Sequence, residues 1–134
     1  IYRRYVERKV ETYRSMAMKK NGAWFGAFIG TELAGTLGIF TGYGIARFQH
    51  VVTHPAFRRR GVCGTLVHEI GSLALTRDDV DCLVMQAEPG EDSARLYKSL
   101  GFEQTELLYS LQKVTTAFEG NEEVTQKFHV QPST

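Results

Sequence analysis

The chain has 134 residues, of which 43% are hydrophobic and 23% charged, a balance typical of a soluble globular domain that excludes a disordered or collagen-like chain. Basic and acidic residues number 16 and 15, so the formal net charge is +1. From this charge we predict no nucleic-acid partner and no binding to a membrane surface. The longest apolar-rich run, residues 23–30, is too short to span a bilayer, and the sequence shows no signal-peptide pattern. The two cysteines, Cys63 and Cys82, lack a metal or redox spacing and favour a reduced, cytoplasmic protein.

The first half of the chain is predicted to be one helix followed by three strands. Residues 2–20 repeat apolar side chains at steps of three and four, as an amphipathic helix does, and Asn21-Gly22 is typical of a helix end. Three apolar segments with turn residues between them then predict strands, over residues 23–30, 33–40 and 45–53. The tight connection between the first two strands predicts that they pair antiparallel.

The second half is predicted to alternate helix and strand, over residues 61–76, 81–87, 92–100 and 102–113. The strand–helix–strand order in the middle of the chain requires a crossover and therefore two parallel strands. The predicted fold is α+β, a three-layer αβα domain with a mixed sheet. We assign residues 1–113 to one domain and residues 114–134 to a polar C-terminal extension. Alternating Phe128 and Val130 are consistent with an added strand in that extension.

The segment from Val51 to Leu66 carries the most chemical information. A strand leads through three arginines into the start of a helix that is rich in small residues, Gly61-Val62-Cys63-Gly64. The first N–H groups of a helix lack intrahelical partners and form the positive end of its dipole, so such a segment suits a phosphate or pyrophosphate. The spacing matches neither a Walker A loop nor a dinucleotide-binding fingerprint. Taken alone, the R-R-R-G run is better explained as a solvated basic loop.

Two motifs together resemble the GNAT superfamily of acyl-CoA N-acyltransferases. The segment 58–63 (R-R-R-G-V-C), preceded by 53–57 (T-H-P-A-F), matches the family's [QR]-x-x-G-x-[GA] turn, with Cys63 where the family prefers Gly or Ala. The segment 96–102 (L-Y-K-S-L-G-F) matches the family's L-Y-x-x-x-G-F motif, although Gly90 stands where an Asn is usual. The resemblance covers about residues 20–113, and both motifs lie within 45–102.

This resemblance implies the acyl-CoA N-acyltransferase fold, with a mostly antiparallel sheet whose central parallel strands splay apart. Acetyl-CoA, as co-substrate, is expected between those strands, with the main chain of Val51, Val52 and Thr53 on its pantetheine arm. The residues expected at its pyrophosphate are Arg58, Arg59, Arg60, Gly61, Val62, Cys63, Gly64 and Thr65. No metal is expected, since the histidines show no ligand pattern.

The implied reaction is transfer of an acetyl group to a primary amine of a small molecule or protein. Tyr97 matches the family's tyrosine that protonates the leaving thiolate, and its structural alternative is a boundary aromatic on an amphipathic helix. Arg47 and Gln49 occupy the positions where relatives often carry Glu or His, and neither can act as the general base. His50 is expected on the opposite face of the sheet. Glu88 is therefore the candidate general base. The alternative is a non-catalytic acyl-CoA-binding sensor or partner module of the same fold.

The edge of the predicted sheet leads to a further expectation. The family fold usually begins with a strand, and none precedes Tyr2. Either the chain is a fragment that lacks the first strand, or the tail near Phe128–Val130 or a second subunit supplies the missing edge. A second subunit at this edge would give a homodimer. The acceptor site is expected to include the first helix, which carries seven basic residues, and Trp24 and Phe25 are candidates for its lining.

Overall fold

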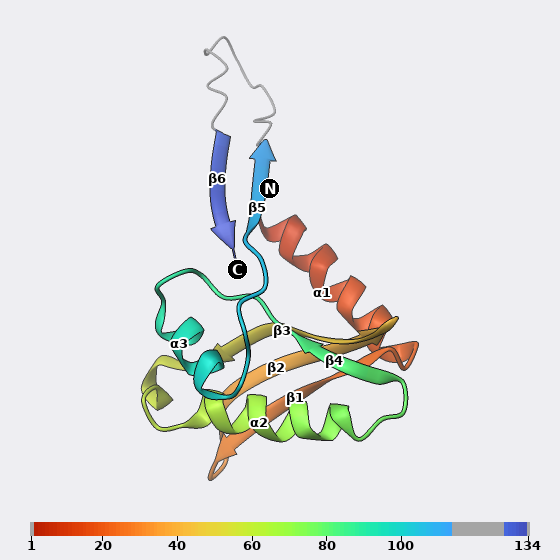
Figure 1. Cartoon of the computed structure of the whole chain (residues 1–134), viewed down its shortest axis with the longest axis vertical. Helices are drawn as coiled ribbons and strands as arrows, with labels where there is room; N and C mark the ends of the chain where they lie inside the picture. Colours follow the sequence, from red (N-terminus) through yellow and green to blue (C-terminus); the bar gives the residue numbers. More distant parts are fainter. Residues whose placement is uncertain (1, 114–127, 134) are drawn as a thin grey trace. The chain divides into compact units, whose positions relative to one another are not determined.

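The computed structural model describes residues 2–113 and 128–133, and the chain divides into two compact units, Ile1–Met85 and Gln86–Thr134 (Figure 1). The first unit contains, in order, α1 (Tyr2–Met18), β1 (Gly22–Ile29), β2 (Glu32–Gly42), β3 (Gly44–Thr53), the 3-10 helix η1 (Pro55–Phe57), α2 (Val62–Leu75) and β4 (Val80–Val84). The second unit contains α3 (Asp92–Ser99), β5 (Leu108–Lys113) and β6 (Phe128–Ser133).

The sheet of the first unit has the strand order β1-β2-β3-β4. The pairs β1–β2 and β2–β3 are antiparallel, whereas β3 and β4, which α2 connects, are parallel. Tyr43 and Gly44 join β2 to β3 with φ angles of 54° and 78°, the conformation of a tight hairpin turn. The structure thus confirms a mixed, mostly antiparallel sheet with one parallel pair.

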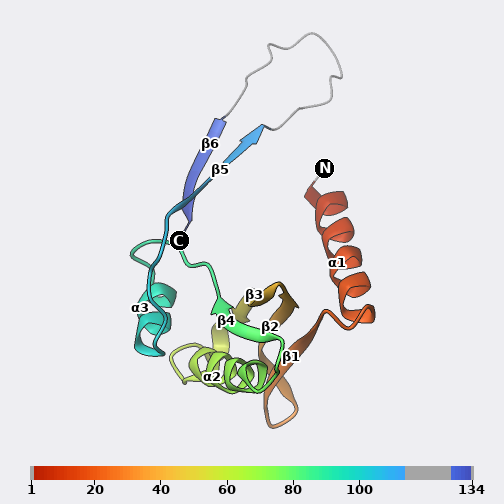
Figure 2. The same ribbon diagram turned by 45° about the vertical axis from the view of Figure 1, so that its right-hand side comes forward.

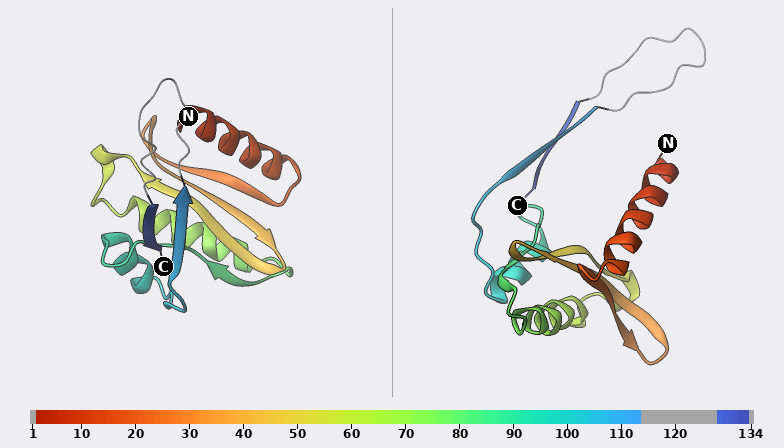
Figure 3. Two further views of the ribbon diagram at one scale, coloured as in Figure 1. Left: turned by 90° about the horizontal axis from the view of Figure 1, so that it is seen from above. Right: turned by 90° about the vertical axis from the view of Figure 1, so that its right-hand side faces the viewer.

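Helices lie on both faces of this sheet (Figure 2; Figure 3, right). Helix α2 covers one face, where Leu37 and Val67 have the largest of the fully buried side chains described. A Cβ at Gly71 would lie 3.0 Å from Leu83 Cδ1, so α2 packs against the sheet as closely as a glycine permits. The three layers α1, sheet and α2 confirm the predicted αβα architecture.

Helix α1 is fixed to the opposite face mainly by Tyr13. The Tyr13 ring centroid lies 5.4 Å from that of Trp24 and 5.8 Å from that of Phe40. The helix ends at Met18, close to the predicted Asn21-Gly22 stop, and Asn21 O accepts a hydrogen bond of 2.6 Å from the Thr41 N–H. No residue of α1 is buried in the described helix, so a large part of its apolar side stays open.

Helix α3 of the second unit ends where the sequence predicted. Gly101 has a φ of 95°, and the N–H groups of Gly101 and Phe102 each bond at 3.1 Å to carbonyls of the last turn, on Lys98 and Tyr97. This is a Schellman motif, in which glycine takes the left-handed position. At its start, Glu91 occupies the N-cap, and no side chain caps the helix.

Two strand boundaries differ from the sequence-based prediction. The predicted strand 81–87 ends at Val84, where its pairing with β3 ends. The predicted strand 102–113 begins only at Leu108, the first residue that pairs with β6. In both cases the pairing partner, which local sequence does not reveal, sets the limit. The predicted domain boundary adjoins residues 114–127, which lie outside the described residues, so it stays a prediction.

Candidate functional site

The parallel strands stop pairing partway along β3. β3 and β4 pair from Gly44↔Val80 to Arg47↔Val84, whereas β3 continues to pair with β2 as far as Thr53. From Val51 to Thr53, β3 therefore has β2 as its one sheet neighbour among the described residues. The N–H and C=O groups on the other edge of that stretch can bond to an extended ligand that carries amides.

A β-bulge interrupts the same part of β3. Gly38 pairs with Gln49 and Thr36 pairs with Val52, so one residue of β2 faces two residues of β3. The first of these two is His50, whose φ of 46° is unusual for a residue other than glycine. The bulge resets the alternation of side chains along the strand.

Gln49 and His50 consequently both point toward α1. The Tyr13 hydroxyl donates a hydrogen bond of 3.5 Å to Gln49 Oε1, and the Tyr13 ring centroid is 5.4 Å from that of His50. The expectation that His50 faces the opposite side of the sheet is wrong, because regular alternation fails at the bulge.

The loop that follows β3 is held by His54 and Phe57. The His54 N–H donates to Ala34 O at 2.8 Å, and His54 Nδ1 accepts a hydrogen bond of 3.2 Å from the Ala56 N–H. Phe57 is buried, and the Arg60 guanidinium carbon lies 5.5 Å from its ring centroid. His54 therefore has a structural role in shaping the turn that leads to α2.

The start of α2 has the features of an anion site. Gly61 is the N-cap with a φ of 78°, no side chain caps the helix, and its first turn contains no acidic residue. The first intrahelical bond joins the Thr65 N–H to Gly61 O at 3.0 Å, so the amides before Thr65 have no acceptor within the helix. Arg58, Arg59 and Arg60 precede this turn and are exposed. Backbone amides, dipole and arginines together favour a bound anion.

Cys63 and Cys82 do not form a disulfide. Cys63 is half-buried in the first turn of α2, and Cys82 is exposed on β4. Among the described residues, no group of three His, Cys, Asp or Glu side chains could hold a metal ion. No helix in the described part of the chain is long and apolar enough to cross a membrane.

The two predicted catalytic side chains belong to the second unit. Tyr97, on α3, is 7% exposed, and its ring centroid lies 6.3 Å from that of Phe102 in an edge-on arrangement. Glu88 is exposed and follows the end of β4 by four residues, with its carbonyl accepting from the Glu91 N–H at 3.3 Å. Glu88 therefore does not lie at a strand end, as the sequence had predicted, because β4 is shorter.

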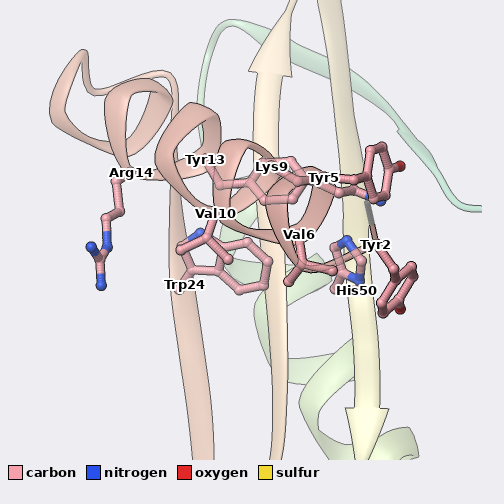
Figure 4. A pocket seen from close by; sticks show the side chains of 9 residues that line it. All are labelled: Tyr2, Tyr5, Val6, Lys9, Val10, Tyr13, Arg14, Trp24 and His50. Carbon is pink, nitrogen blue, oxygen red and sulfur yellow. The ribbon is translucent and has the colours of Figure 1, made fainter. Parts of the chain in front are cut away.

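A pocket of about 530 Å³ lies between α1 and the sheet, and we call it the α1 pocket (Figure 4). Its lining residues come from α1, β1 and β3: Tyr2, Tyr5, Val6, Lys9, Val10, Tyr13, Arg14, Trp24 and His50. Burial, and then the positive charge of Lys9, lower the pKa of His50 below its ordinary value of 6.5, so its imidazole is neutral at pH 7. The sequence predicted Trp24 and Phe25 for such a lining, and of these two Trp24 lines the pocket and Phe25 does not. It missed His50, because no sequence signal marks the bulge.

Comparison with known families identifies the chain. The family model described as "Acetyltransferase (GNAT) domain" matches residues 20–104, so the protein belongs to the GNAT acetyltransferase family. No curated protein matches the sequence. The resemblance proposed from the two motifs is thereby confirmed at the level of the family.

Solved structures share the fold at low sequence identity. A GNAT family acetyltransferase from Elizabethkingia anophelis with acetyl-CoA bound aligns with a TM-score of 0.64 and 15% identity, over 91% of this chain and 80% of that one. An aminoglycoside N-acetyltransferase in complex with CoA aligns with a TM-score of 0.62 and 16% identity, over 89% of this chain and 90% of that one. A Bacillus subtilis acetyltransferase in complex with CoA aligns with a TM-score of 0.61 and 16% identity, over 85% of this chain and 76% of that one. These similarities confirm the acyl-CoA N-acyltransferase fold.

Proposed function

We propose that the protein is an acetyl-CoA-dependent N-acetyltransferase that acts on the primary amine of a small molecule or protein. The observation that carries this proposal is the stretch from Val51 to Thr53, which borders the parted strands and leads into the amide-rich start of α2. Membership of the GNAT family supports it, as do the CoA and acetyl-CoA bound to proteins of the same fold.

The coenzyme is proposed to lie along this stretch. Pantetheine carries two amides, which match the N–H and C=O groups of Val51, Val52 and Thr53. The pyrophosphate is proposed to sit at the start of α2, on residues 58–65, where the helix dipole and the arginines compensate its charge. Since Cys63 is small, its side chain leaves the first-turn amides accessible.

The proposed reaction moves two protons for each acetyl group. A base takes one proton from the acceptor's ammonium, and the neutral nitrogen attacks the thioester carbon. The C–N bond forms, the C–S bond breaks, and Tyr97 donates a proton to the leaving thiolate. The second proton of the nitrogen replaces the one lost by Tyr97, so one proton passes to water overall.

Two side chains are proposed for the base. The sequence proposes Glu88. The geometry adds His50, which lines the α1 pocket and whose lowered pKa favours the neutral imidazole. Within the part of the chain that the structure describes, no hydrogen bond to a ring nitrogen of His50 is found, and the unprotonated nitrogen of the neutral ring is the one that can accept a proton from an amine. We also propose, from the sequence, that the protein forms a homodimer and is located in the cytoplasm.

Calorimetric titration with CoA tests the coenzyme site. Cys63→Asp adds a carboxylate to the first turn of α2, where it suits the helix dipole but repels the pyrophosphate. Two like charges about 5 Å apart at the surface weaken binding about a hundredfold. Cys63→Ser is the matched neutral control and is expected to bind within about threefold of the native protein. Equal affinities of both variants would refute the site.

Release of free CoA thiol in the presence of an amine panel tests turnover. An N-acetyltransferase releases CoA only when a suitable amine is present. CoA binding without release for any amine would instead identify the non-catalytic acyl-CoA-binding alternative.

A further inference from the structure

Aromatic rings dominate the α1 pocket. They come from three elements: Tyr2, Tyr5, Tyr13, Trp24 and His50. Trp24 remains 40% exposed and Tyr5 57% exposed, so their faces are accessible from the pocket. Flat rings around an open space of this size suit a planar aromatic ligand, which can stack or pack edge-on against them.

The charged side chains that line the α1 pocket are both positive. Lys9 and Arg14 are its charged lining residues, and no carboxylate is found among the lining residues described. Lys9 is half-buried, and its charge reaches His50, whose pKa it helps to lower. Glu7, on the same helix, does not line the pocket and forms an exposed ion pair of 2.9 Å with Arg3. A polycationic ligand is therefore disfavoured here, and an anionic group is favoured.

The pocket also adjoins the proposed reaction site. His50 lines the pocket, and it is the residue of β3 immediately before Val51, where the stretch proposed for pantetheine begins. An amine placed beside His50 is thus close to the strand that would carry the thioester. Figure 4 shows Arg14 beyond Trp24, on the side away from His50.

We propose that the α1 pocket receives the acceptor, and that the acceptor is an amine carrying an aromatic ring and a carboxylate. The ring packs on Trp24, the carboxylate points toward Arg14 and the amine toward His50. Lys9, on the His50 side, favours the neutral amine over the ammonium ion. This inference rests on the proposed function, and it narrows the acceptor to a class that excludes polyamines.

Binding of two matched amines tests the inference without any coenzyme. 4-(Aminomethyl)benzoate and benzylamine differ only in the carboxylate, and Trp24, the sole tryptophan, reports their binding by its fluorescence. We expect the carboxylate to tighten binding about tenfold, the effect of one charge-assisted hydrogen bond. In the Arg14→Gln variant, the affinities for 4-(aminomethyl)benzoate and benzylamine should differ by no more than about threefold. Arg8→Gln removes a charge from the same helix outside the pocket, and this variant should retain the tenfold preference for the amine with the carboxylate.

Equal affinities for the two amines would overturn the inference, as would tighter binding of spermidine or an equal loss of preference in Arg8→Gln. The outcome is separate from that of the proposed function, because acetyl-CoA is absent from the titration. If neither amine changes the Trp24 signal while the protein acetylates other amines, this inference is wrong and the proposed function stands. If CoA fails to bind, the proposed function is wrong whatever the fluorescence shows.

Discussion

Tyr97 shows how one residue can satisfy a structural and a chemical interpretation together. Its ring is buried against Phe102, as expected for a boundary aromatic on an amphipathic helix. Its position in the L-Y-x-x-x-G-F motif indicates the proton donor of the family. Packing of the ring and donation by the hydroxyl use different atoms, so a substitution can separate them.

Tyr97→Phe keeps the ring and removes the hydroxyl. We expect kcat to fall about a hundredfold or more, the usual contribution of a general acid, with the dissociation constant of CoA changed less than about threefold. Steady-state kinetics and calorimetry measure the two quantities. A similar loss in both would show that the hydroxyl acts in binding and would contradict the role as proton donor.

The direction of His50 toward α1 leads to a pH prediction. Its pKa lies below the ordinary value of 6.5, because burial and Lys9 disfavour the imidazolium form. The neutral form accepts the proton, so the contribution of His50 to kcat/KM should be present at neutral pH and be lost as the pH falls through the lowered pKa. His50→Gln should lower kcat/KM and remove this acid limb, whereas Glu88→Gln should retain it. The reverse result would identify Glu88 as the base.

At the scale of elements, periodic segments were predicted well and their limits less well. The helices over residues 2–18 and 62–75 follow an apolar repeat that depends only on local sequence. The end of β4 and the start of β5 depend on partners far along the chain, so local apolar residues extended both predicted strands too far. Strand pairing, rather than propensity, decided these boundaries.

Gly35 shows how closely β2 approaches the start of α2. A Cβ at this position would lie 2.9 Å from Val62 Cγ1 and 3.1 Å from Val52 O. We expect Gly35→Ala to lower the free energy of unfolding by about 1–3 kcal/mol, as overpacking of a core does. Gly42→Ala, where no atom lies within 4 Å of the added Cβ, is the control and should leave stability nearly unchanged. Urea denaturation measures both, and equal stability of the two variants would contradict the packing argument.

At the scale of the molecule, the sequence indicates the proposed coenzyme site more fully than the α1 pocket. Residues 51–65 are contiguous, so one motif could indicate the whole proposed coenzyme site. The α1 pocket combines α1 with Trp24 on β1 and His50 on β3, and only the folded sheet brings them together. A bulge that redirects one side chain has no sequence pattern of its own, which is why His50 was assigned to the wrong face.

The free edge of β1 bears on assembly. In the described sheet β1 pairs with β2 alone, and β6 pairs with β5 rather than with this edge. Phe28 on β1 is 63% exposed. Since an uncovered apolar edge favours pairing, we expect sedimentation equilibrium to give the mass of a dimer, and Phe28→Lys to weaken it at least about tenfold. Tyr43→Lys, the same change at an exposed turn, is the control. A native monomer would contradict this expectation.

The bulge in β3 reverses the odd–even order of the strand. Before it, the even-numbered Ala46 and Phe48 are buried, whereas after it the odd-numbered Thr53 pairs with Gly35 on the face that α2 covers. Deleting His50 would restore uninterrupted alternation and leave Val52 and Thr53 paired with Thr36 and Gly35 on their present faces. A strand of the present length without the bulge would instead exchange inside for outside after Gln49. The one extra residue in β3 therefore sets which of the following side chains face α1 and which face α2.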